Sequence, residues 1–332
     1  MTSITVSNVD EALPALIRIL DSGGVVDDSR NGKVLTLYSP ISVTFLAPWE
    51  RFVMHPVRRS NVAFLVMEGL WMLAGRRDVF WISRFNEQMK AYSDNEDTFH
   101  GAYGHRLRSC GRDQLSECAA MLKLDPTTRR AVAQIWDADS DLGSISKDIP
   151  CNDLIMFRVM EGRVLDMTVC NRSNDLVWGM CGANAAHFSM IHEYVAAKAG
   201  LVQGRWTQFS NNLHMYLDTP RLDQLRKIPS TNSTWYSDYS RDSIPLVGGS
   251  IEQFDRELRM FMAATEVNRR ITYKFTEPFF ETVAKPLFNY WVSRKYLSFP
   301  YEVYLEDVKS IADQAIQVLA LQWISEDKNE TV

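Results

Sequence analysis

Cys151 and Arg172 are the two side chains whose types and spacing best suit covalent chemistry. Cys151 precedes one apolar run, LIMFRVM, and Arg172 follows a second, VLDMTVC. The turn Glu161-Gly162-Arg163 between the runs predicts two neighbouring strands, which would bring the thiol and the guanidinium close together. A neighbouring guanidinium favours the reactive thiolate. The alternative interpretation is a buried structural cysteine and a surface arginine.

Glu68 is the second candidate, because it is the one carboxylate in a strongly apolar stretch at residues 60–75. This stretch predicts a helix that is capped by Ser60 or Asn61 and ends at Gly75. Burial in such a helix would raise the pKa of Glu68 into the range of general acid–base catalysis. The alternative is a glutamate on the one face of the helix that water reaches.

The composition limits the kind of protein that carries these residues. The chain has 332 residues, of which 46% are hydrophobic and 23% charged, as in ordinary globular proteins. We expect one domain over residues 1–332, with a core at about 25–220 and a mainly helical region at about 221–332. The net charge of −5 makes nucleic acid an unexpected partner. Five cysteines without a CxxC pair predict neither a disulfide framework nor a metal site.

The elements around the candidates can be read from periodicity. Helices are expected at residues 8–21, 112–124 and 184–200, and a strand at residues 131–136. A longer strand at residues 204–216 would present His214 and Tyr216 on one face. The N-terminus lacks a signal peptide, and no apolar run has the length of a membrane span, so we expect a cytoplasmic protein without a membrane partner.

Taken in order, these pieces resemble the thymidylate synthase superfamily, which includes the pyrimidine nucleotide hydroxymethylases. The resemblance runs from about Ser29 to Tyr216 and rests on a Ser-Arg-Asn-Gly turn, MEGLWMLAG, GAYG, DPTTRR, PCND, NRSND and LHMY. It implies an α/β fold, a sandwich with a large mixed β-sheet flanked by helices, here with a helical C-terminal extension. It also implies a homodimer that forms through the backs of the sheets.

The resemblance assigns catalytic roles by position. Cys151 matches the nucleophile whose thiolate adds to C6 of the pyrimidine ring and makes C5 nucleophilic. C5 then attacks the one-carbon unit of the cofactor, 5,10-methylenetetrahydrofolate. Glu68 matches the carboxylate that manages proton transfers through ordered water.

The resemblance also implies ligands for the phosphate of a pyrimidine nucleoside monophosphate. Arg30, Arg172 and Ser173 match ligands from the same subunit. Arg129 and Arg130 match a pair that the neighbouring subunit donates. Four guanidiniums around one dianion suit bidentate recognition.

Further residues match contacts to the sugar, the base and folate. His214 and Tyr216 match the ligands of the sugar hydroxyls, and Asp175 matches a residue that contacts folate. A count forward along the chain places the base reader at Ala183, but a count back from His214 places it at Asn184. We prefer Asn184, which implies one inserted residue within Met180–Ala183. Its amide both donates and accepts, which favours uracil without excluding cytosine.

Three departures from the synthase pattern favour a hydroxymethylase. Met89 and Tyr92 stand where synthases carry two tryptophans beside folate, and losing that shield favours capture of the methylene intermediate by water. Asn152 replaces the histidine that follows the nucleophile. The chain ends in SEDKNETV without the closing segment typical of synthases.

The leading hypothesis is therefore a pyrimidine nucleotide 5-hydroxymethylase acting on a (deoxy)cytidine or (deoxy)uridine monophosphate. The first alternative is a divergent thymidylate synthase that makes dTMP from dUMP. The others are a non-catalytic nucleotide- or RNA-binding relative and a hydrolase that pairs Cys151 with a histidine. Ser173 keeps the pattern of enzymes for deoxynucleotides, which favours that sugar.

Overall fold

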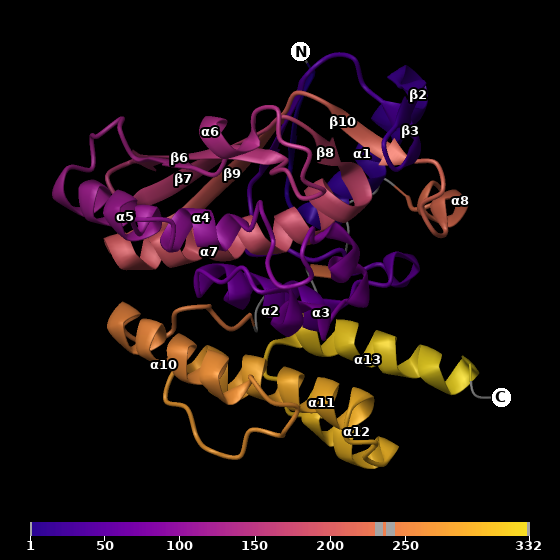
Figure 1. Cartoon of the computed structure of the whole chain (residues 1–332), viewed down its shortest axis with the longest axis vertical. Coiled ribbons are helices and arrows are strands. Elements are labelled where there is room, and N and C mark those ends of the chain that lie inside the picture. The colour runs from indigo at the N-terminus through magenta and orange to yellow at the C-terminus, as the bar shows by residue number, and fades with distance from the viewer. Residues whose placement is uncertain (1, 230–234, 237–242, 331–332) are drawn as a thin grey trace.

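A six-stranded mixed sheet forms the body of the protein, and most of the helices are layered on one side of it (Figure 1). The computed structural model describes residues 2–229, 235–236 and 243–330. The strand order is β1-β4-β9-β7-β6-β5. This arrangement confirms the predicted α/β class. Its strands are β1 (Thr2–Val6), β4 (Ile41–Phe45), β5 (Val132–Gln134), β6 (Asn152–Met160), β7 (Val164–Asn171) and β9 (Val202–Ser210).

A second sheet of four strands, in the order β2-β3-β10-β8, lies beside the first. The turn between β2 and β3 carries Arg30. The prediction of one strand over residues 204–216 is wrong, because the chain changes sheets at Asn211 and Asn212. Strand β9 pairs with β7, whereas β10 pairs with β3 and β8. The strands of this sheet are β2 (Val25–Ser29), β3 (Gly32–Thr36), β8 (Asn174–Asp175) and β10 (Leu213–Tyr216).

The predicted strand pair around Cys151 and Arg172 is present as β6 and β7. The two strands are antiparallel, and Asn152 pairs with Asn171 at their open end. Glu161 and Gly162 turn the chain in left-handed conformations, with φ of 51° and 73°. The residue before β6 and the residue after β7 therefore lie side by side.

Helix α2 (Val62–Leu73) confirms the predicted apolar helix, and every one of its residues is buried. Asn61 caps it by accepting a hydrogen bond from the backbone N–H of Phe64 at 3.0 Å. Gly200 ends α7 in a left-handed conformation, as predicted. The other helices of this part are α1 (Val9–Gly23), α3 (Val79–Ser83), α4 (Tyr103–Arg108), α5 (Gln114–Leu124), α6 (Ala138–Asp141), α7 (Asn184–Ala199) and α8 (Leu222–Leu225).

The C-terminal region is helical, as predicted, and lies beyond α2 and α3 on the side away from the sheets (Figure 1). The Trp291 indole donates to the Arg84 carbonyl at 2.9 Å, and the Gln322 amide donates to the Met54 carbonyl at 3.2 Å. The single-domain organisation stays a prediction. The last two residues of the terminal stretch SEDKNETV, 331–332, lie outside the described residues. The helices of the C-terminal region are α10 (Ile251–Ala264), α11 (Lys285–Lys295), α12 (Tyr301–Lys309) and α13 (Gln314–Glu330).

Candidate active site

A cavity of about 920 Å³ opens where the β2–β3 turn, the loop before β6 and the end of β10 meet. Its wall contains eight of the residues that the sequence singled out, although they come from segments far apart in the chain. These residues are Arg30, Tyr92, Cys151, Arg172, Ser173, Asp175, His214 and Tyr216. The cavity is therefore the candidate active site.

The predicted proximity of Cys151 and Arg172 is found at the floor of this cavity. The backbone N–H of Arg172 donates to the Cys151 carbonyl at 3.0 Å, and its Nη2 lies 3.7 Å from Sγ. The same guanidinium donates to the carbonyls of Pro150 at 2.7 Å and Ile149 at 3.1 Å. Arg172 thus holds the loop that carries the thiol.

Arg172 lowers the pKa of the Cys151 thiol, as expected, but its effect is not the largest one. Burial raises the pKa of the Cys151 thiol, and the guanidinium of Arg172 only partly offsets that effect. Asp148 and Asp153 raise the pKa further through their negative charge. The thiol is therefore protonated near neutral pH before a ligand arrives.

The arginines predicted to bind phosphate occupy two different places. Arg30 lies at the cavity and donates to the Lys147 carbonyl at 3.0 Å, on the same loop that Arg172 holds. Arg129 and Arg130 are exposed just before β5 and do not line this cavity. The cavity therefore contains two of the four predicted guanidiniums.

His214 and Tyr216 share one face of β10, as predicted, with ring centroids 5.4 Å apart. The Nδ1 atom of His214 hydrogen-bonds to the Asn212 side-chain oxygen at 3.0 Å. Burial lowers the pKa of His214, while the negative charge of Asp175 opposes that shift. A largely neutral imidazole therefore faces the cavity.

Asn184 begins α7, directly after the π-helical segment Leu176–Ala183. The backbone leaves helical geometry at Cys181 and Gly182, within the stretch where we expected an inserted residue. The Asn184 side-chain Nδ2 donates to Asn174 Oδ1 at 3.1 Å. Its amide is thus held from the side, although Asn184 itself does not line the 920 Å³ cavity.

A buried polar network fixes that amide. Gln208 donates to the Met180 carbonyl at 3.1 Å, so its side-chain oxygen points the other way. This oxygen accepts from Asn174 Nδ2 at 2.9 Å, and Asn174 Oδ1 in turn accepts from Asn184. Because the Met180 carbonyl can only accept, it fixes the orientation of the Gln208 amide. Gln208 then fixes the amide of Asn174, and Asn174 fixes that of Asn184. Gly179 permits the close approach, since a Cβ there would lie 2.4 Å from Asn174 Oδ1.

Glu68 lies deeper than the cavity wall, and its side chain is only 12% exposed. The alternative of a water-facing glutamate is therefore wrong. Burial, with a smaller contribution from the charge of Asp148, raises the pKa of Glu68 to about 8. The carboxyl is thus protonated near neutral pH, which suits an acid–base group.

Of the residues predicted to contact folate, Asp175 and Tyr92 line the cavity and Met89 does not. Asp175 lines the cavity, accepts a hydrogen bond from the Trp178 backbone N–H, and has a buried Oδ2 without a hydrogen-bond partner. Tyr92 lines the cavity and is half exposed. Met89 instead packs against the hydrophobic core. Asn152 is buried and donates to the Asn171 side chain, away from the cavity wall.

Several residues around the site had no signal in the sequence. Asp148 lines the cavity and acts on both Glu68 and Cys151. Tyr103 accepts a hydrogen bond from the Cys151 backbone N–H at 3.3 Å. His187 lies against Glu68 from α7. None of these contacts repeats at a fixed spacing, so periodicity could not find them.

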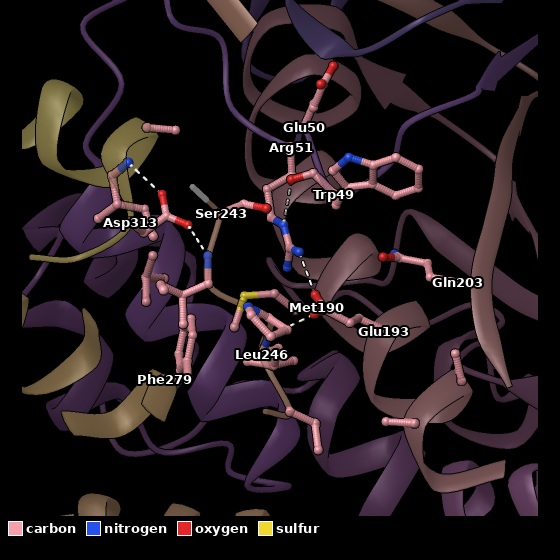
Figure 2. Close-up of a pocket in the computed structure, with 18 of the residues that line it drawn as sticks. Trp49, Glu50, Arg51, Met190, Glu193, Gln203, Ser243, Leu246, Phe279 and Asp313 are labelled. Carbon is pink, nitrogen blue, oxygen red and sulfur yellow. Dashed lines mark hydrogen bonds and ion pairs between the residues drawn. The ribbon is translucent and has the colours of Figure 1, made fainter. Parts of the chain in front are cut away.

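A second cavity, of about 490 Å³, lies between α7 and the C-terminal helices (Figure 2). Arg51 pairs with Glu193 across it, and the Leu246 backbone N–H donates to the same glutamate at 2.7 Å. Asp313 accepts from the Ile244 backbone N–H at 3.1 Å. Because these charged groups already have partners, we assign this cavity no chemistry.

Within residues 2–229, 235–236 and 243–330, no group of three or more histidine, cysteine or acidic side chains could hold a metal ion. No helix in that part of the chain has the length and apolar character needed to cross a membrane.

The thymidylate synthase family profile matches residues 13–241. The deoxyuridylate hydroxymethyltransferase of Pseudomonas phage M6 is 39% identical over 98% of this chain and 94% of its own length. The protein of the same name from Bacillus phage SP01 is 35% identical over 78% of this chain and 70% of its own. A putative thymidylate synthase from Methanothermobacter thermautotrophicus is 27% identical over 64% of this chain and 93% of its own. The chain belongs to the thymidylate synthase family.

Proposed function

We propose that this protein is a deoxyuridylate 5-hydroxymethylase that works through a covalent adduct of Cys151. The observation that carries the choice of reaction is the extent of the similarity. The M6 hydroxymethyltransferase aligns with 98% of this chain, whereas the putative archaeal synthase aligns with 64%. The leading expectation from the sequence agrees with the names of the phage relatives.

The 920 Å³ cavity supports a nucleoside monophosphate as substrate. Arg30 donates to the Lys147 carbonyl, and Arg172 donates to the carbonyls of Ile149 and Pro150. The remaining N–H groups of both guanidiniums can bind a phosphate. Ser173 stands next to Arg172 at the same wall. His214 and Tyr216 lie farther along the cavity, where a sugar hydroxyl would meet them.

The amide network supports uracil as the base. With Nδ2 held by Asn174, the Oδ1 atom of Asn184 can accept from N3–H of uracil, and the second Nδ2 hydrogen can donate to O4. Cytosine presents the opposite pattern, an acceptor at N3 and a donor at position 4. Binding cytosine would turn Asn184 Oδ1 toward Asn174 Oδ1, which places two acceptors together.

The reaction needs no oxidant. The Cys151 sulfur bonds to C6, and the electron pair displaced from the C5–C6 double bond makes C5 nucleophilic. Bound 5,10-methylenetetrahydrofolate supplies a one-carbon unit at the oxidation level of formaldehyde. Glu68 manages the protons as C5 loses its hydrogen and water adds to the exocyclic carbon. Loss of the Cys151 sulfur then restores the ring.

A groove beside the cavity fits folate. It has a volume of about 510 Å³ and is lined by Val177 and the exposed Trp178, which follow Asp175 of the cavity wall along the chain. Arg58 and Arg59 line it, and the Nε atom of Arg58 is buried without a hydrogen-bond partner in the described residues. Guanidiniums and an aromatic wall suit a flat pterin with a carboxylate tail. Arg58→Ala should therefore raise KM for the folate and leave KM for dUMP nearly unchanged.

We propose a homodimer through the uncovered face of the large sheet. Thr44, Thr168, Thr207 and Cys170 are half-buried on that face, and Met156 beside them is 39% exposed. Dimerisation there would bring exposed Arg129 and Arg130 of one subunit toward the phosphate of the other.

The five free cysteines and the need for a reduced nucleophile favour a cytoplasmic location.

The decisive experiment incubates the protein with dUMP and methylenetetrahydrofolate and determines both products. We expect 5-hydroxymethyl-dUMP and tetrahydrofolate, with no dihydrofolate absorbance. Formation of dTMP with dihydrofolate would instead identify a synthase. A Cys151→Ala protein with normal turnover would exclude the covalent mechanism for both.

A further inference from the structure

His187 and Glu68 form an isolated pair behind the candidate active site. The imidazole Nε2 lies 3.1 Å from Glu68 Oε2, and the side chains are 5% and 12% exposed. Neither atom has a hydrogen-bond partner elsewhere in the described residues. Helices α2 and α7 approach closely here because residue 69 is glycine, where a Cβ would lie 2.3 Å from the Met190 sulfur.

The tautomer of His187 decides what this contact means. The ring hydrogen-bonds to the Leu65 backbone carbonyl, which can only accept. Since Nε2 is the atom without such a partner, Nδ1 carries the hydrogen and Nε2 carries a lone pair. A carboxylate oxygen facing this lone pair at 3.1 Å would be repelled, whereas a protonated carboxyl donates to it. The geometry therefore requires one proton between the two groups.

The pKa shifts of His187 and Glu68 agree with one proton between the two groups. Burial lowers the pKa of His187 to about 3, so the ring is neutral. Burial and the charge of Asp148 raise the pKa of Glu68 to about 8. Asp148, in the loop before β6, is the other titratable group that acts on Glu68; the Phe64 ring packs edge-on against the imidazole. The shared proton rests on Glu68.

We propose that His187 is a positioning residue whose Nε2 lone pair accepts the hydrogen of protonated Glu68 Oε2 and so fixes the orientation of the carboxyl. With Oε2–H held by the ring, Oε1 is the oxygen left to face the water that adds to the exocyclic carbon. The ring stays neutral throughout, and without its lone pair the carboxyl can turn away from the reacting centre. This role rests on the proposed hydroxymethylase function.

Two substitutions separate this role from packing. A glutamine amide reaches the place of Nε2, so His187→Gln keeps an acceptor for Glu68. An asparagine amide reaches the place of Nδ1, so His187→Asn keeps the Leu65 contact and loses the Glu68 contact. We expect His187→Asn to lower kcat about 100-fold, as misplacement of a proton-transfer group does, and to shift the pH profile of kcat. His187→Gln should retain most activity, and KM for dUMP should stay constant in both.

His192 offers a matched control on the same helix. It is equally buried and its Nε2 contacts the Leu165 carbonyl at 2.6 Å, with no carboxylate in that contact. His192→Gln and His192→Asn should change thermal stability without moving the pH profile. Equal losses in His187→Gln and His187→Asn, with an unmoved profile, would show that the ring only fills space.

A direct measurement covers the case in which His187→Asn does not fold. Nitrogen-15 NMR of the wild-type protein labelled at its six histidines reports the tautomer of each ring. We expect a neutral His187 ring with its hydrogen on Nδ1, assigned from the signal that His187→Gln removes. A hydrogen on Nε2 would overturn the proposal. Because NMR needs no turnover, a failure of the hydroxymethylase assay itself remains distinguishable.

Discussion

Removing Asn174 should weaken the preference for uracil over cytosine. Asn174→Ala deletes the acceptor that fixes the Asn184 amide, without touching the Asn184 side chain itself. In the native protein, cytosine binding would require that amide to turn over and leave Asn184 and Asn174 facing each other as acceptors. In Asn174→Ala the amide can turn without that conflict.

The magnitude follows from the hydrogen bond at stake. Leaving one buried polar group unpaired costs roughly 1–3 kcal/mol, which corresponds to about 5- to 150-fold in specificity. We expect the ratio of kcat/KM for dUMP to that for dCMP to fall by a factor in this range in Asn174→Ala. Most of the change should come from a higher kcat/KM for dCMP and not from a lower kcat/KM for dUMP.

The assay is tritium release from C5 of each nucleotide, which reports C5 activation whichever product forms. Asn171→Ser is the matched control, because Asn171 is buried and contacts Gln208 and Ser210, while within the described residues it makes no hydrogen bond to Asn184. It should lower stability and leave the ratio nearly constant. A ratio in Asn174→Ala equal to that of the wild type would refute the orientation argument.

Three further outcomes are expected. Gly179→Ala should reduce kcat/KM for dUMP about tenfold, since its Cβ displaces the oxygen that holds Asn184; calorimetry should show a folded protein. Glu68 stays protonated in the folded state up to a pKa of about 8, so its burial costs stability progressively as pH rises from 4.5 to 8. Denaturation of Glu68→Gln should therefore show a gain over the wild type of roughly 3–5 kcal/mol at pH 8 and little gain near pH 4. Mixing Cys151→Ala with Arg130→Ala subunits should restore activity that neither homodimer has, whereas no recovery would exclude donation of Arg130 across an interface.

The sequence was informative where one local element positions a residue. Cys151 and Arg172 flank a single strand pair, so the turn between the strands predicted their contact. The apolar periodicity around Glu68 likewise predicted burial. The contacts of His187 with Glu68 and of Gln208 with Asn174 join segments far apart in the chain, and only the folded backbone brings them together.

The protonation state of Cys151 was harder to predict than its position beside Arg172. The sequence placed a guanidinium beside Cys151 but did not reveal how deeply the thiol is buried. Burial has the opposite effect on the pKa and outweighs the guanidinium. The same limit applies to Met89, whose position along the chain matches a folate contact while its side chain packs against the core.

The protonated state of Cys151 also affects how long the enzyme survives between encounters with substrate. Peroxides oxidise the thiolate form of cysteine to sulfenic acid, and higher oxides cannot be reduced back by ordinary thiols. A nucleophile whose pKa is raised until a ligand enters resists that damage while it waits. Cys110, which is exposed, should react with oxidants first. An idle enzyme in an oxidatively stressed cell should therefore lose Cys110 before it loses activity.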